Sequence, residues 1–177
     1  MPVGSTYAGL TDEFARGTSF ANVEWSSYDP KYPHPDNPKW TVSWIGVIRS
    51  AYFAHAEECR RAGLPVEAYN ADLCCAERDK IYPSDGSREF LFECTNNGEP
   101  GEGIYLQGAH VLMNATASAP VPKGGYVCLL PLCTAHNTYV LKEGSYSGQG
   151  YYMKLERPMR AVLLSGYMYP SVPGTLP

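Results

Sequence analysis

Apolar side chains recur at steps of three and four residues between positions 42 and 62, which predicts the longest helix of the chain. The members of this apolar stripe are Ile45, Ile48, Tyr52, Ala56 and Cys59. Thr41 or Ser43 can cap the start of the helix, and Gly63 suits the position that follows its end. His55 lies on the same stripe, so we interpret it as a hydrogen-bonded core histidine in preference to a ligand.

Beyond this helix the apolar positions gather in shorter runs that predict β-strands. The predicted strands are Phe90–Cys94, Ile104–Met113 and Tyr126–Leu132, with one or two more within Tyr151–Leu164. A short helix is predicted over Thr134–Lys142, whereas residues 66–82 fit a helix or a strand equally well. The order of the elements predicts a single α+β domain in which an N-terminal helix packs with a small antiparallel sheet.

The glycine and proline content adds many turns to this picture, because the chain holds 17 Gly and 15 Pro. Four of the prolines lie between positions 28 and 38, which favours an extended or turning segment there. We therefore expect residues 1–90 to form an irregular and helical region. It would pack on the same core as the strands of residues 91–177.

The charge of the chain and the composition of its segments indicate the partners and the cellular compartment to expect. The net charge is −4 and no basic stretch is evident, so the usual electrostatic signature of a nucleic-acid binder is missing. The chain shows neither a signal-peptide pattern nor an apolar run of 18 residues. We expect a cytoplasmic protein that does not bind a membrane.

The six cysteines point to a metal ion, because thiols in a reducing compartment tend to be ligands or buried apolar groups. Cys133 and His136 form a Cys-x-x-His pair, whose spacing lets one turn direct both side chains at a tetrahedral ion. Cys94, at the end of a predicted strand, is a third candidate. A fourth ligand would come from Cys59, Cys74, Cys75 or Cys128. The neighbouring Cys74 and Cys75 diverge in regular structure, so we expect at most one of them to bind, and we take Cys75 as the ligand. A secreted protein with disulfide bonds is the alternative.

Residues 94–142 resemble the HNH, or ββα-metal, nucleases and their treble-clef relatives. Two sequence motifs carry the resemblance, Gly108-Ala-His-Val111 and Pro131-Leu-Cys-x-x-His-Asn137. The resemblance implies an HNH-like ββα knuckle at the C-terminal side of the domain. It implies that His110 is the general base and that Asn137 binds a catalytic ion such as Mg²⁺. It also implies that Cys133 and His136 belong to a structural Zn²⁺ site.

The chain departs from the family pattern at three places. Ala109 replaces the acidic residue or histidine that usually precedes the base. Gly124 and Gly125 stand near the position of the usual strand asparagine, and Cys94 is alone where the family has a Cys-x-x-Cys pair. By the family pattern, the first two departures remove a ligand of the catalytic ion and the residue that orients the base, and the third removes a ligand of the structural zinc site.

Three functions remain open from the sequence. The resemblance implies a metal-dependent phosphodiester hydrolase, with nucleic acid as its substrate. The second is a non-catalytic, zinc-stabilised protein that binds a protein partner or a second copy of itself through its Tyr- and Pro-rich surface. The third is a small-molecule enzyme built on the same scaffold.

Overall fold

The computed structural model describes residues 6–24, 32–34, 37–91, 106–122, 124–138 and 150–167. Eight strands form one antiparallel sheet in the order β1-β10-β8-β7-β2-β9-β5-β6. They are β1 (Thr6–Phe14), β2 (Ser19–Asn22), β5 (Lys80–Pro83), β6 (Phe90–Leu91), β7 (Leu106–Met113), β8 (Val127–Cys133), β9 (Tyr151–Lys154) and β10 (Met159–Ser165). A separate pair is formed by β3 (Tyr32–His34) and β4 (Asn37–Val42). The helices are α1 (Trp44–Ala62) and α2 (Thr134–Thr138).

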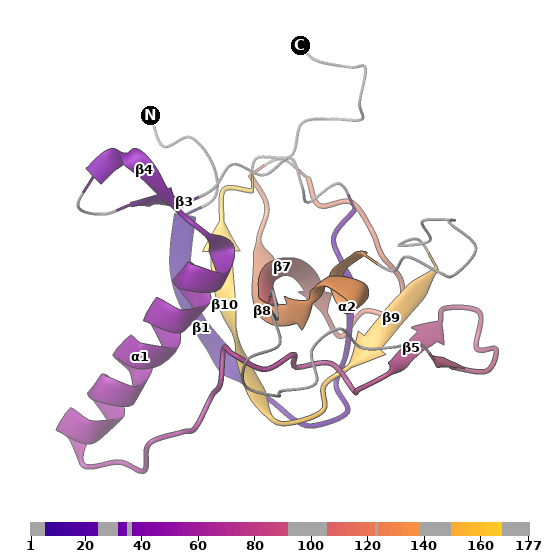
Figure 1. Ribbon diagram of the computed structural model, residues 1–177, viewed down its shortest axis with the longest axis horizontal. Helices are drawn as coiled ribbons and strands as arrows, with labels where there is room; N and C mark the ends of the chain where they lie inside the picture. Colours follow the sequence, from indigo (N-terminus) through magenta and orange to yellow (C-terminus); the bar gives the residue numbers. More distant parts are fainter. Residues whose placement is uncertain are drawn as a thin grey trace.

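A bent two-stranded ribbon makes the sheet curl around its core. Strands β1 and β2 are separated by one corner, and β10 and β9 by another; the two corners pair through Gly17 N to Leu155 O (2.8 Å) and Leu155 N to Thr18 O (3.0 Å). In one half of the ribbon, β10 also pairs with β8. In the other half, β2 also pairs with β7. Because β7 also pairs with β8, the strands surround a common interior. Figure 1 shows β9 and β10 diverging from their shared corner.

Helix α1 has the ends that the sequence predicts. The side chain of Ser43 accepts a hydrogen bond from the backbone N–H of Gly46, which satisfies one of the free donors of the first turn. Gly63 follows the helix with φ at 67°, a left-handed conformation that glycine adopts without a steric penalty. The helix packs its buried face, which includes Ile45 and Ile48, against β7 and β8.

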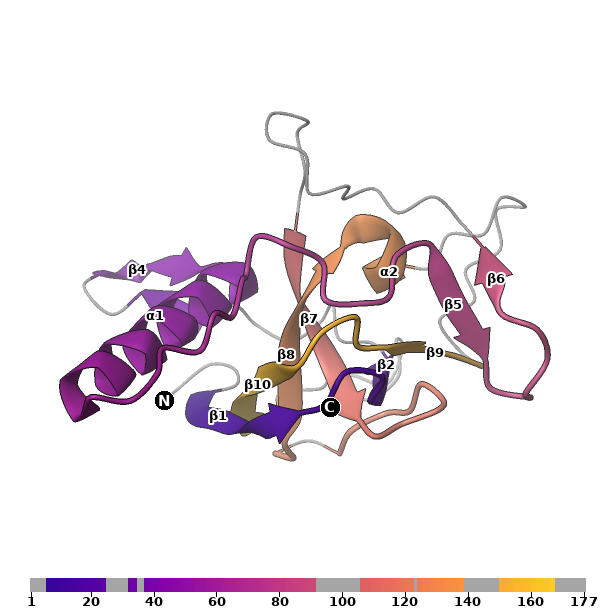
Figure 2. The same ribbon diagram turned by 90° about the horizontal axis from the view of Figure 1, so that it is seen from below.

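Strand β7 contacts the start of α1 at Gly108. A Cβ atom at this position would lie 2.6 Å from the Cβ of Trp44 and 2.7 Å from the backbone nitrogen of Ile45. Only a residue without a side chain allows the helix to approach the strand this closely. The helix is thereby fixed on β7 and β8, the two strands that α2 also contacts (Figure 2).

The predicted fold of a small sheet with a C-terminal HNH-like ββα knuckle is wrong. Strands β7 and β8 are inner strands of the eight-stranded sheet, flanked by β2 and β10, and α2 has only five residues. The reason lies in β8, where Leu129, Leu130 and Leu132 are all fully buried. A strand that is buried on both faces needs cover on both sides, and a small isolated knuckle does not supply it.

Residues 6–24 contain strands that the sequence pattern does not predict. They contribute β1 and β2 to the sheet. Most side chains of β1 are exposed or half-buried, and Gly9, with φ at 125°, lies where the pairing with β10 shifts register. Such an edge strand has no regular apolar alternation, because its partner β10 and not its own pattern fixes its conformation.

Candidate metal centre

The end of β8 and the first turn of α2 place a thiol and an imidazole together. Cys133 is the last residue of β8, and His136 follows three positions later within α2, so both side chains lie on one face of the turn. Both residues are fully buried. The Sγ atom of Cys133 lies 3.2 Å from Nδ1 of His136.

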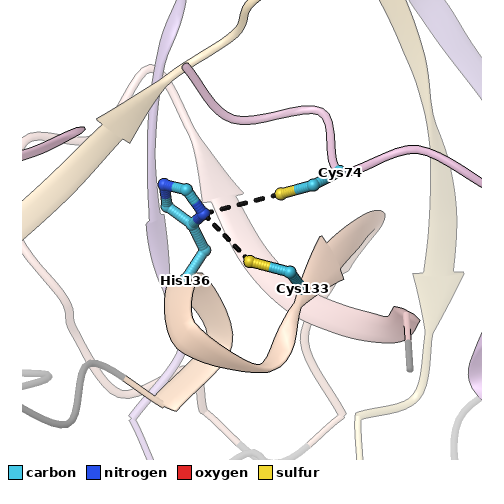
Figure 3. Close-up of side chains that lie close together, drawn as sticks. All are labelled: Cys74, Cys133 and His136. Atoms are coloured by element: carbon cyan, nitrogen blue, oxygen red, sulfur yellow. Dashed lines mark hydrogen bonds between the residues drawn. The ribbon is translucent and has the colours of Figure 1, made fainter. Parts of the chain in front are cut away.

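A second thiol reaches the same ring nitrogen from the segment between α1 and β5. Sγ of Cys74 lies 3.6 Å from Nδ1 of His136, and Figure 3 shows the two sulfur atoms approaching this nitrogen from different elements. The neighbouring backbone explains the placement. Cys75 N donates to the carbonyl of Pro131 at 3.0 Å, which holds the segment beside β8 two residues before Cys133.

The other ring nitrogen of His136 fixes the tautomer. Its Nε2 lies 3.1 Å from the backbone oxygen of Lys80 in β5, and a carbonyl oxygen can only accept a hydrogen bond. Nε2 therefore carries the proton, and in the neutral ring the lone pair of Nδ1 points toward the two thiols. Metal-binding histidines are oriented in this way, with the distant N–H donated to a carbonyl or carboxylate.

The dimensions of the group suit a tetrahedral ion. The three ligand atoms of Cys74, Cys133 and His136 all lie within 4.8 Å of one another. Bond lengths of about 2.0 Å to nitrogen and about 2.3 Å to sulfur require ligand atoms roughly 3.6 Å apart around Zn²⁺. The N–S distances of 3.2 and 3.6 Å are close to this value. We call these three residues the Cys–Cys–His group.

Buried amides hold α2 in place around this group. Nδ2 of Asn22, a buried residue of β2, donates to the backbone oxygens of His136 (3.2 Å) and Asn137 (3.1 Å). Nδ2 of Asn137 donates to Oε1 of Gln107 in β7. Asn137, the predicted ligand of a catalytic ion, thus uses its amide N–H to hold α2 against the sheet.

The structure describes three of the four predicted metal ligands and brings only two of them together. Cys133 and His136 lie together, and Cys74 joins them in place of Cys75. The side chain of Cys75 is fully buried in the hydrophobic core, and burial raises the pKa of its thiol to about 12. Cys94 lies outside the described residues, so its role as a ligand stays a prediction. Among the described residues, no disulfide links Cys59, Cys74, Cys75, Cys128 and Cys133 to one another.

His110, the predicted general base, is enclosed by aromatic rings. It is 4% exposed. The ring of Trp44 meets it edge-on with centroids 5.1 Å apart, and the ring of Tyr167 lies 5.9 Å away. Along β7 it is four residues from Leu106, the partner of Cys133, a separation of about 13 Å. The structure therefore places His110 under α1 and away from the Cys–Cys–His group.

Cys74 is the ligand candidate that the sequence analysis did not select. The available signal was the Cys74-Cys75 pair, but the choice between the two depends on which side of the segment faces β8. Tertiary hydrogen bonds such as Cys75 N to Pro131 O decide this, and they leave no local pattern in the sequence.

Fold and site together define an antiparallel β protein with a curled sheet and a Cys–Cys–His group at the end of an inner strand. Comparison of the chain with protein-family models, curated proteins and solved structures finds no match. Nothing in these comparisons bears on the resemblance to the HNH nucleases. Among the described residues, no helix combines the length and apolar character needed to cross a membrane. The functional argument therefore rests on the chemistry of the site.

Proposed function

We propose that this protein binds one zinc ion through Cys74, Cys133 and His136. The observation that carries the proposal is the orientation of His136, whose proton-free Nδ1 faces both sulfur atoms while Nε2–H is held by Lys80 O. Thiolate and imidazole ligands in a tetrahedral arrangement favour Zn²⁺. Mg²⁺ prefers oxygen ligands, and the three side chains of this group offer none.

The ion would stabilise the fold by linking three parts of the chain. Cys74 comes from the segment after α1, Cys133 from β8 and His136 from α2. Two of the three ligands are fully buried, which is typical of structural sites in which the ion replaces part of an apolar core. Cys74 is half-buried and lies at the accessible side of the group. A fourth ligand would complete the tetrahedron, and Cys94 is the sequence-based candidate for it.

Elemental analysis of the purified protein tests the proposal. The protein is prepared with a thiol reductant and without chelators, and we expect about one zinc per chain. His136→Ala and Cys133→Ser should lose the ion. Cys128→Ser is the matched control, because Cys128 is a half-buried thiol of the same strand that does not belong to the group, and it should keep the ion. A wild-type protein that contains no metal and takes up none on zinc titration would overturn the proposal.

A variant of Cys94 tests the proposed fourth ligand separately. If this thiol completes the site, Cys94→Ser should retain zinc with a weakened affinity, because three ligands remain. If the affinity does not change, water or another group fills the fourth position.

Phosphodiester hydrolysis remains a proposal that rests on the family resemblance alone. The enclosure of His110 weighs against it, because a general base must reach the water it activates. The test is incubation of the zinc-loaded protein with single- and double-stranded DNA and RNA in the presence of Mg²⁺ or Mn²⁺. We expect no cleavage; cleavage that His110→Ala abolishes would support the nuclease instead. Zinc-stabilised binding of a protein partner or a second copy remains the alternative without catalysis.

A further inference from the structure

Arg157 is the side chain that holds the carbonyl groups of the segment bearing Cys74. It lies in the corner between β9 and β10. Its Nη1 donates to the carbonyl of Cys74 at 2.9 Å, and its Nη2 donates to the carbonyls of Leu73 (2.9 Å) and Asn70 (3.1 Å). The planar guanidinium thus fixes three carbonyl groups within five consecutive residues.

This contact matters because the segment from 64 to 79 has little regular structure. Its ladder contact is the isolated bridge between Ala76 and Leu155. The ion pair between Arg49 and Asp72 is exposed, with 53% and 71% of the side chains accessible, so it adds little rigidity. Two of the hydrogen bonds from Arg157, those to the carbonyls of Leu73 and Cys74, are partly buried, and the second of these ends on the ligand residue itself.

Backbone contacts on the other side complete the placement. The N–H of Glu156 donates to Cys75 O at 2.8 Å, next to the carbonyl of Cys74 that accepts from Arg157. The corner between β9 and β10 therefore holds two consecutive carbonyl groups of this segment. Without the guanidinium, the carbonyl of Cys74 would lose a charged donor and the residues before it would lose their anchor. The chain would then have to order Cys74 at the moment of metal binding, at a cost in conformational entropy.

We propose that Arg157 is a positioning residue that holds the Cys74 thiolate ready for the metal; this inference rests on the zinc site proposed above. Arg157 acts through the backbone of Cys74 and does not itself contact the ion. Partners that orient metal ligands typically contribute about 10- to 100-fold to metal affinity. Removal of Arg157 should therefore reduce only the contribution that the Cys74 thiolate makes to metal affinity.

Titration with Co²⁺, a spectroscopic probe for zinc sites, provides the test. Bands from thiolate-to-cobalt charge transfer report how many sulfur ligands bind. We expect Arg157→Gln to bind Co²⁺ about 10- to 100-fold more weakly than wild type, with charge-transfer intensity reduced toward that of Cys74→Ser. Arg157→Lys keeps a charged donor and should recover part of the affinity, and it serves as the second variant if Arg157→Gln does not fold.

Arg160→Gln is the matched control. Arg160 is an arginine of the same part of the chain that also donates three hydrogen bonds, two to the carboxylate of Glu67 and one to the carbonyl of Thr11. Its loss should destabilise the protein without altering the cobalt spectrum. This comparison separates positioning of a ligand from a general loss of stability.

A double-mutant cycle tests whether Arg157 affects metal binding through Cys74. If Arg157 acts through Cys74, the change Arg157→Gln should not weaken Co²⁺ binding further once Cys74→Ser is present. Equal affinity and an equal spectrum for wild type and Arg157→Gln would overturn the inference, as would fully additive losses in the double variant. These outcomes are distinct from failure of the zinc proposal, in which wild type itself would bind no ion.

Discussion

At the scale of single residues, neighbouring cysteines have opposite surroundings. Cys74 is half-buried and faces His136, whereas Cys75 is fully buried in the core. The same two residues carry the same functional group, so only their position relative to β8 separates a ligand from a packing residue. Burial raises the pKa of Cys75 to about 12, which keeps its thiol protonated and unreactive at neutral pH.

This difference predicts the order of alkylation. In metal-free protein, iodoacetamide should modify Cys74 well before Cys75, and Cys75 should react only on unfolding. Zinc should slow the reaction at Cys74, because a bound thiolate is a weaker nucleophile than a free one. Fragmentation mass spectrometry of the peptide that holds both residues measures each site. Faster modification of Cys75 than of Cys74 would contradict the arrangement.

A second residue-scale prediction concerns Glu67. Its carboxylate accepts hydrogen bonds from Arg160 at 2.8 and 3.2 Å, from Tyr69 at 2.6 Å and from His55 at 2.7 Å. These donors, Arg160 first, lower the pKa of Glu67 to about 2. A lowered pKa in the folded state gives stability that is present above the ordinary value near 4.5 and is lost as the pH falls toward 2.

Metal-free wild type should therefore lose more stability than Glu67→Gln when the pH is lowered from 5 to 3. The side chain of Glu67 is 33% exposed, so the difference should be modest, on the order of 1 kcal/mol. Urea unfolding at each pH measures it. If the free energy of unfolding falls equally with pH in both proteins, the hydrogen-bond donors do not stabilise the ionised carboxylate of Glu67.

At the scale of elements, the approach of α1 to β7 depends on Gly108. Any side chain there would collide with the backbone of Trp44 and Ile45, which cannot move without displacing the whole helix. The contact also encloses His110, because the Trp44 ring covers that imidazole. The packing of one helix end therefore sets the surroundings of the strand residue that the family resemblance marks as catalytic.

Gly108→Ala should reduce the free energy of unfolding by about 1–3 kcal/mol, or more if the helix is forced away from the strand. Gly63→Ala is the control, because its φ of 67° disfavours alanine although nothing lies within 4 Å of the added Cβ. That control should cost only about 1 kcal/mol, because the penalty of a left-handed conformation for alanine is partly offset by the lower entropy of its unfolded chain. Denaturant unfolding of both variants gives the comparison, and an equal or larger loss for Gly63→Ala would contradict the close packing at Gly108.

Local signals explain which elements the sequence predicted well. The ends of α1 depend on Ser43 and Gly63, which act within one turn of the helix. Cys133 and His136 are brought together by their spacing alone. By contrast, β1 depends on partners such as Ser165, which pairs with Thr6 across most of the chain. Neither such distant pairing nor the choice of Cys74 is encoded in a short stretch of sequence.

At the scale of the whole molecule, the proposed ion links the segment after α1 to the end of β8 and to α2. Binding to the folded state alone stabilises it by about 4 kcal/mol when free zinc is roughly a thousand times the Kd. For a chain of 177 residues this corresponds to a Tm increase on the order of 10 °C.

Addition of a strong chelator should accordingly lower the Tm of the zinc-loaded protein, and excess zinc should restore it. Calorimetry measures both steps. Cys133→Ser should melt at a similar temperature with and without zinc, whereas Cys128→Ser should respond as wild type does. A zinc-loaded wild type whose Tm ignores the chelator would show that the ion does not stabilise the fold.

The bent ribbon has a consequence for biosynthesis. Thr6 and Ser165 share a hydrogen bond across 159 positions of sequence, and the first strands find their ladder partners among residues made much later. While the ribosome is still adding those residues, β1 must wait as an unpaired edge. Closure of the curled sheet is thus a late event that follows translation of almost the whole described chain, and until then the unpaired strand edges favour aggregation.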